Sequence, residues 1–189
     1  MKYSYDRSEI KKISLSGFLS MVSVRSKRIA AAPDDLPVSE FNANRLAKSL
    51  HPAVQHVKIA KVEEHTEAKS FTLVPDKERG PESLAYFRAS QYVSVNLNIN
   101  GTALSKPYTI RSGPGSALGE DGTSYVLTIK LTRPGFASQW ILENWKEGDR
   151  VDISGPLGDF YYDRIRDAGT VVALAGGSGI TPFYSMAEA

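Results

Sequence analysis

The 189-residue sequence contains no cysteine, which excludes disulfides, thiolate metal ligands, a cysteine nucleophile and an iron–sulfur cluster held by this stretch of chain. It also lacks a charge excess: 23 Lys and Arg residues balance 21 Asp and Glu residues, and a net charge of +2 gives no general attraction to nucleic acid. No apolar run reaches the roughly 20 residues that a membrane-spanning helix needs. A hydrophobic content of 41% is still sufficient for a domain with a sizeable core. We therefore expect a soluble, cytoplasmic protein whose chemistry depends on a cofactor or on groups other than thiols.

Motifs for metal binding and hydrolysis are also missing. His51, His56 and His65 show no metal-ligand spacing with carboxylates, so we expect surface histidines. No carboxylate pair suggests hydrolytic acid–base catalysis. The run 176–179 comes closest to the Gly-x-Ser-x-Gly turn of a serine hydrolase but is one residue out of register.

Residues 1–53 form an extension to the rest of the chain. Leu15, Phe18, Leu19 and Val22 have helical spacing, which predicts a helix that packs on the remainder of the protein. A cleaved signal peptide or a basic amphipathic helix on a membrane surface are the alternatives for this segment. A Pro- and Asp-rich break at 32–37 follows, and then a short helix that Ser39 caps and that ends at Leu50.

From Val54 the hydrophobic period changes to two. Strands are predicted around 57–62, 71–73, 92–99, 104–111, 125–132 and 150–154, with one helix over 138–145. Asn100-Gly101 predicts a tight hairpin turn because both residues tolerate positive φ. Closely spaced strands with a single helix favour a closed antiparallel barrel of six strands over residues 54–165, so the fold class is mainly β.

The pattern changes again near the C-terminus. Thr170–Ala175 is a continuous apolar run, typical of a strand buried on both faces of a parallel sheet. It leads into the glycine turn 176–179 and then into a helix that Thr181 caps, with Pro182 in its first position. Such a unit is suited to holding phosphates, and a tight strand-to-helix turn is the plainer alternative. We interpret residues 166–189 as the first βα unit of a Rossmann-like nucleotide-binding domain that is incomplete in this chain, because a βαβ unit needs about thirty residues. These residues are therefore expected to be poorly ordered or to pack on the barrel or on another copy of the chain.

Four segments in fixed order carry a resemblance to a known family. They are Lys106-Pro107-Tyr108-Thr109, Gly135-Phe136-Ala137-Ser138, Gly155-Pro156-Leu157-Gly158-Asp159-Phe160 and the glycine turn at 176–182. The chain resembles the ferredoxin–NADP reductase superfamily from about Val54 onward. The resemblance implies a six-stranded antiparallel Greek-key barrel that binds flavin, followed by a nucleotide-binding domain. Ala89-Ser90 stand where the family usually has Pro-Gly, and Lys106 stands where it commonly has arginine.

The resemblance also implies site residues. Tyr108 and Thr109 are the predicted catalytic pair, with the tyrosine against the flavin ring and the threonine hydroxyl beside flavin N5, where hydride arrives. Lys106 and Arg111 are expected near the flavin phosphates, although lysine lacks the bidentate fork of arginine. The remaining predicted cofactor-binding residues are Thr128, Ile129, Lys130, Gly135, Phe136, Ala137, Ser138, Gly176, Gly177, Ser178, Gly179 and Thr181.

The implied function is a flavoprotein oxidoreductase. Hydride from NADH or NADPH would pass to flavin N5, and the electrons would then leave singly to a ferredoxin-like or other iron–sulfur or haem acceptor. The expected cofactor is FAD, with FMN as the alternative, and any 2Fe-2S center lies outside this chain. Two other hypotheses remain open: a flavin- or partner-binding barrel without its own hydride transfer, and a noncatalytic all-β interaction module.

Overall fold

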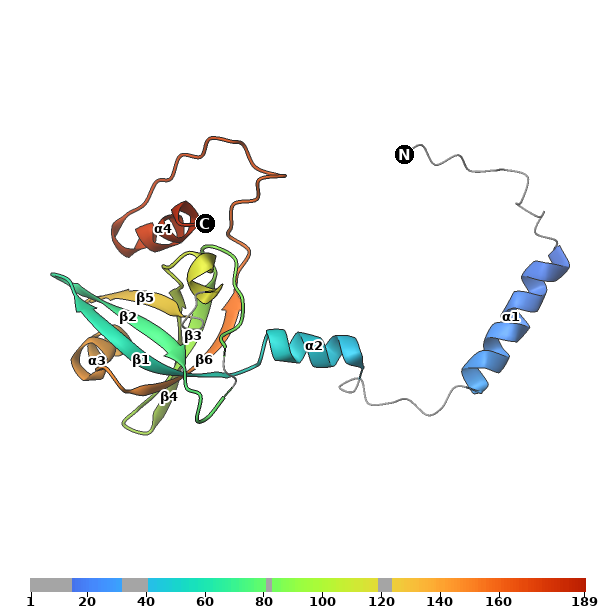
Figure 1. Ribbon diagram of the computed structural model, residues 1–189, viewed down its shortest axis with the longest axis horizontal. Coiled ribbons are helices and arrows are strands. Elements are labelled where there is room, and N and C mark those ends of the chain that lie inside the picture. Colours follow the sequence, from blue (N-terminus) through green and yellow to red (C-terminus); the bar gives the residue numbers. More distant parts are fainter. Residues whose placement is uncertain (1–14, 32–40, 81–82, 119–123) are drawn as a thin grey trace. The chain divides into compact units, whose positions relative to one another are not determined.

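The structure is a computed structural model that describes residues 15–31, 41–80, 83–118 and 124–189. The chain divides into two compact units, residues 1–45 and 46–189. The first contains helix α1 (Leu15–Ala30) (Figure 1). Leu19 and Val22 of this helix are exposed. Helix α2 (Asn42–Leu50) ends where we expected, while the predicted cap Ser39 and the break at 32–37 lie outside the described residues. Among the helices of the described ranges, none is long and apolar enough to cross a membrane.

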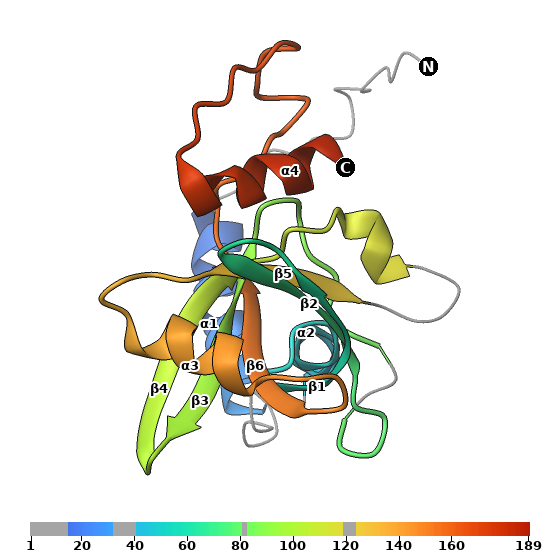
Figure 2. The ribbon, with the colours of Figure 1, turned by 90° about the vertical axis from the view of Figure 1, so that its left-hand side faces the viewer.

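The second unit is built on one curled antiparallel sheet of six strands in the order β4-β3-β6-β1-β2-β5 (Figure 2). This order confirms the predicted Greek-key barrel, because β6 inserts between β3 and β1 and strands distant in sequence become neighbours. The strands are β1 (Gln55–Glu64), β2 (Ala68–Pro75), β3 (Tyr92–Ile99), β4 (Thr102–Thr109), β5 (Tyr125–Lys130) and β6 (Arg150–Leu157).

The period-two pattern determines which side chains enter the barrel. Along β3, Val93, Val95, Leu97 and Ile99 are buried and alternate with more exposed neighbours. Equivalent alternation along β5 turns Leu127 and Ile129 inward and leaves Thr128 on the outer face. The inward residues form one hydrophobic core, and their removal from water is the main source of stability for a barrel of this kind. The outer face is thereby free to carry polar residues for a site.

The two edge strands of the sheet, β4 and β5, meet only over a short stretch. Ile110 forms an isolated bridge with Leu127, and the amide of Arg111 donates to the carbonyl of Val126 at 2.7 Å. The barrel closes at this point and is open between the rest of β4 and β5. Sheet edges expose side chains and backbone groups that ladder pairing would otherwise cover, so this gap is where a ligand has access.

The turn and helix predicted within the barrel are both present. Asn100 and Gly101 have φ angles of 52° and 82°, as the β3–β4 hairpin requires. Helix α3 (Phe136–Asn144) starts two residues before its predicted first residue and packs Ile141 into the core. Trp145, which follows α3, contacts Phe71 edge to face at 5.2 Å and so adds to the packing of the core.

The C-terminal segment corrects two details of the prediction. Thr170–Ala175 is exposed and irregular rather than a strand, because no strand among the described residues lies beside it to complete its hydrogen bonds. Helix α4 (Thr181–Ala187) has Ile180 as its cap, so Thr181 is already helical and its hydroxyl donates to the Ser178 carbonyl at 3.0 Å. Of the arrangements expected for this segment, α4 shows packing on the barrel, since Ser185 is fully buried against the loops that hold Ser90 and Ser112.

Candidate functional site

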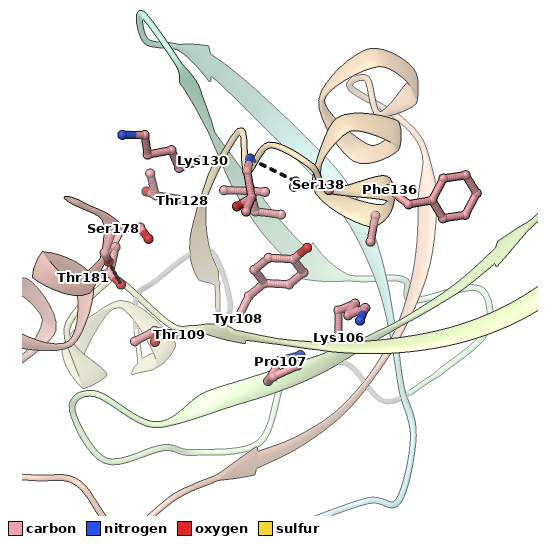
Figure 3. A pocket seen from close by; sticks show the side chains of 14 residues that line it. Lys106, Pro107, Tyr108, Thr109, Thr128, Lys130, Phe136, Ser138, Ser178 and Thr181 are labelled. Carbon is pink, nitrogen blue, oxygen red and sulfur yellow. Dashed lines mark hydrogen bonds between the residues drawn. The ribbon is translucent and has the colours of Figure 1, made fainter. Parts of the chain in front are cut away.

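A cavity of about 390 Å³ opens at the gap between β4 and β5. This volume lies in the range typical of small-molecule sites. Its walls come from β4, β5, the start of α3 and the start of α4 (Figure 3). The lining residues are Lys106, Pro107, Tyr108, Thr109, Thr128, Ile129, Lys130, Thr132, Gly135, Phe136, Ala137, Ser138, Ser178 and Thr181.

Most of the sequence-predicted site residues therefore gather in one place. Residues of β4 and β5 meet there because the curled sheet brings its two edge strands together, and Ser178 and Thr181 reach the cavity because α4 packs on the barrel. Arg111, Gly176, Gly177 and Gly179 are the predicted residues that do not line the cavity. Pro107 and Thr132 line it and were not predicted, although Pro107 lies inside the Lys106–Thr109 segment that indicated the site.

The Tyr108 ring projects from β4 toward the side chains of β5 (Figure 3). Its ring is half-buried and packs against the edge of the core. Burial raises the pKa of its phenol above the usual value, so the hydroxyl stays protonated and able to donate a hydrogen bond. An aromatic face held by the core, with a polar tip, is suited to contact with a flat conjugated ring.

The start of α3 forms the second wall. A Cβ at Gly135 would lie 2.3 Å from the Thr132 carbonyl oxygen, so this tight turn requires glycine. Ser138 is 8% exposed, and its hydroxyl oxygen accepts a hydrogen bond from the Thr132 amide at 3.2 Å, which ties the helix to the end of β5. The first amides of a helix have no intrahelical acceptor and carry partial positive charge, so a nine-residue helix that starts at the cavity wall offers donors for an anion.

Cationic side chains lie at the rim of the cavity. Lys106 and Lys130 are both exposed, and Lys130 also pairs with Glu67 at 3.2 Å. Arg111 is directed elsewhere, because its guanidinium lies over the Tyr184 ring of α4 with 4.4 Å between its central carbon and the ring centroid. Lys106 is thus the cation best located for a phosphate at this cavity.

The glycine turn reaches the cavity through two residues. Ser178 and Thr181 line it from the side opposite α3, while Gly176, Gly177 and Gly179 remain exposed away from it. The cavity is therefore continuous with the segment that we predicted would hold nucleotide phosphates.

An aromatic platform, a helix start with a required glycine and a cationic rim together fit a flavin nucleotide, whose conjugated ring and phosphates need those partners. Residues 54–162 match the model of the oxidoreductase FAD-binding domain family. The chain belongs to that family. FAD is accordingly its cofactor, and the resemblance to ferredoxin–NADP reductases is confirmed.

The most similar relatives include redox proteins of two kinds. The chain is 33% identical over 127 residues to the glycine betaine monooxygenase reductase subunit of Chromohalobacter salexigens, covering 66% of this chain and 31% of that protein. It is 32% identical over 131 residues to the flavohemoprotein of Bacillus subtilis, covering 68% of this chain and 30% of that protein. The chain thus spans about a third of the length of these relatives.

Solved structures show the same fold. A ferredoxin NADP⁺ reductase from Neisseria gonorrhoeae with bound FAD and NADP aligns over 72% of this chain and 51% of its own, with a TM-score of 0.59 and 23% identity. The Amycolatopsis cytochrome P450 reductase GcoB aligns over 72% of this chain and 39% of its own, with a TM-score of 0.56 and 24% identity. These two likenesses support the mainly β, curled six-stranded fold.

Proposed function

We propose that this chain is the flavin-binding part of an NAD(P)H-dependent oxidoreductase that passes electrons singly to an iron–sulfur or haem protein. The observation that carries the proposal is the shared cavity: Tyr108 and Thr109 line it from β4, and Ser178 and Thr181 line it from the glycine turn. A ring bound on Tyr108 and a nicotinamide held near the glycine turn would meet in one space. Bound FAD accepts a hydride at N5 and returns its two electrons one at a time, which is the chemistry that such a chain needs.

The chain's own residues would bind and orient the cofactor. Tyr108 offers its ring to one face of the flavin, and Thr109 offers a half-buried hydroxyl for the N5 edge. Lys106 and the first amides of α3, at Phe136, Ala137 and Ser138, would hold the phosphates. The part of the cofactor between its ring and its phosphates would lie along β5, next to Thr128, Ile129 and Lys130. Arg111 would act indirectly, by holding α4 in place.

The relatives indicate the class of electron acceptor. One is named as a reductase subunit of a monooxygenase and another as a flavohemoprotein. These names support an iron–sulfur or haem acceptor, of which a ferredoxin-like protein or domain is the one we propose. The absence of cysteine means that these 189 residues hold no iron–sulfur cluster themselves.

The experiment is reconstitution of the chain with FAD and, separately, with FMN, followed by the visible spectrum of the desalted protein. We expect retained FAD in the wild type, and at least about tenfold weaker binding in Tyr108→Ala than in Tyr108→Phe, because only the alanine variant loses the aromatic contact. A protein that stays colourless with both flavins would overturn the proposal.

A second candidate is a flavin-binding module that does not itself exchange hydride with a nicotinamide. The exposure of Gly176, Gly177 and Gly179, away from the cavity, favours it. Rapid mixing of the reconstituted chain with NADH and with NADPH distinguishes the two: fast bleaching of the flavin band supports the oxidoreductase, and an unchanged band with FAD still bound supports the module.

A further inference from the structure

Three side chains form an unbroken line of hydrogen bonds from the protein surface to the flavin cavity. His65 is exposed in the turn between β1 and β2, and its Nε2 lies 2.9 Å from the Ser70 hydroxyl oxygen. That oxygen lies 2.8 Å from the Thr128 hydroxyl oxygen. Thr128 lines the cavity from β5. The line therefore connects solvent to the space that FAD is expected to occupy.

The sheet register fixes this line. On β2, Ser70 is paired with Glu63 of β1 on one side and with Thr128 of β5 on the other. The amide of His65 donates to the Ala68 carbonyl at 2.8 Å, which holds the turn close to Ser70. Ser70 is 1% exposed, so its hydroxyl has these two side chains as its hydrogen-bonding partners and little access to bulk water. Buried hydroxyl groups in proteins are almost always hydrogen-bonded, and the Ser70 hydroxyl is hydrogen-bonded to both His65 and Thr128.

Such a line has a direction that depends on the charge of His65. A protonated imidazole donates from Nε2 to Ser70; Ser70 then donates to Thr128, and Thr128 donates its own hydrogen into the cavity. When Nε2 carries a lone pair, every bond reverses: Thr128 donates to Ser70, Ser70 donates to His65, and Thr128 presents lone pairs to the cavity. The charge state of an exposed residue is in this way transmitted to the cavity wall without any movement of the backbone.

We propose that His65, Ser70 and Thr128 carry a proton between the flavin cavity and solvent. This inference rests on the proposed oxidoreductase function. A hydride brings two electrons and one proton, and when both electrons have left to one-electron acceptors one proton remains to be released. In the outward step, Thr128 oxygen takes that proton and passes its own hydrogen to Ser70 oxygen, and Ser70 passes its hydrogen to His65 Nε2. Each hydroxyl breaks one O–H bond and forms another, so no group in the line is oxidised or reduced. The imidazolium then releases the proton to water.

The charged surroundings of His65 are compatible with this role. The nearby carboxylate of Glu63, on β1, interacts with His65, and it is itself paired with Lys61 at 2.7 Å. Arg111 also acts on Glu63, and on the β2 side Lys69 pairs with Glu64 at 3.0 Å. The carboxylates and amines near the turn are thus paired with one another, and His65 is exposed to the water that would take up the proton.

The first test measures the coupling itself and needs no turnover. The titration of the His65 ring is followed by NMR, with and without bound FAD, in wild type, Thr128→Val and the control Thr72→Val. Thr72 lies two residues from Ser70 on β2 and pairs with Val126, outside the line. We expect FAD to shift the His65 midpoint in wild type and in the control, and to leave it unshifted in Thr128→Val, where the isosteric valine breaks the line. An equal shift in all three proteins would overturn the proposal.

The second test follows the proton. FAD-loaded protein that NADH or NADPH has reduced is oxidised by ferricyanide in the presence of a pH indicator. His65→Ala is expected to slow proton release by about 10²-fold relative to the exposed control His51→Ala, the lower end of what a positioned proton carrier contributes. Free imidazole should restore the rate in His65→Ala alone. Equal release in both variants, or no rescue, would refute the relay. Failure of the proposed function is recognised separately, by a protein that binds no flavin or is not reduced.

Discussion

The guanidinium of Arg111 lies 4.4 Å from the centre of the Tyr184 ring, and this stacking docks helix α4 on the barrel. Two hydrogen bonds of the neighbouring residue support it: the Ser185 hydroxyl donates to the Ser112 carbonyl at 2.8 Å and accepts from the Ser90 amide at 3.0 Å. Docking of α4 sets where Ser178 and Thr181 stand at the cavity. The contacts of Arg111 and Ser185 thus position the glycine turn.

Ser185→Ala is expected to weaken this docking. The substitution leaves the buried Ser90 amide without its acceptor, which costs about 1–3 kcal/mol of the free energy of unfolding. Urea denaturation measures the loss, and hydrogen exchange of the Ser90 amide reports it locally. Tyr184→Phe keeps the stacked ring and is the control, with a change within about 0.5 kcal/mol. If Ser185→Ala behaved like the control, the two hydrogen bonds would not contribute to docking.

The sequence predicted the barrel well because period-two alternation and the Asn100-Gly101 turn are local signals that burial reinforces. It also selected most of the cavity residues, since they occur in short contiguous segments. The contact of Arg111 with Tyr184 could not be predicted from the sequence, because it depends on how α4 packs on the barrel. The same holds for His65: its exposure was expected, but its link to Ser70 depends on strand register, which no single residue encodes. The predicted strand over 170–175 failed because apolar composition cannot provide a neighbouring strand.

Gly135→Ala should damage the cavity more than a glycine substitution elsewhere. Its Cβ would lie 2.3 Å from the Thr132 carbonyl oxygen, so the turn before α3 has to shift. We expect a loss of about 1–3 kcal/mol in the free energy of unfolding together with weaker FAD binding. Gly115→Ala is a matched control, since a Cβ there meets nothing within 4 Å. Thermal unfolding and FAD titration of both variants measure these effects. Equal stability and equal FAD affinity of the two variants would contradict the role of this turn.

The ionised Asp152 carboxylate should stabilise the folded protein at neutral pH, and this contribution should be lost in acid. Partial burial alone would raise the pKa of this carboxyl, but hydrogen bonds from His56, at 2.7 Å, and from Arg79 outweigh it and lower the pKa. A group with a lowered folded pKa stabilises the protein above its unfolded pKa, and this stabilisation is lost as the pH falls through the folded value. Asp152→Asn should therefore be less stable than wild type at neutral pH and converge with it in strong acid.

Melting temperatures across the acid range check this expectation, with the exposed Asp159→Asn as the control. Parallel curves for wild type and Asp152→Asn would show that the ion pair has no net effect. A small difference is expected in any case, since the Asp152 side chain is 38% exposed and solvent screens its partners.

Substitutions of Lys106 test whether this cation holds the flavin phosphates. An arginine at this exposed rim position adds a bidentate donor where lysine offers a point charge, so FAD should bind about 2- to 10-fold more tightly, the gain expected from one further hydrogen bond of about 0.5–1.5 kcal/mol. Lys106→Gln removes the charge and should weaken binding, by less at high salt because exposed charges are screened. Fluorescence titrations with FAD and with riboflavin separate the phosphate contribution from that of the ring. Riboflavin carries no phosphate, so its affinity should be the same in all three proteins. If Lys106→Gln bound FAD as tightly as wild type, the phosphates would be held by the amides of α3 alone. An arginine variant that bound FAD no more tightly than wild type would show instead that the point charge of lysine already suffices.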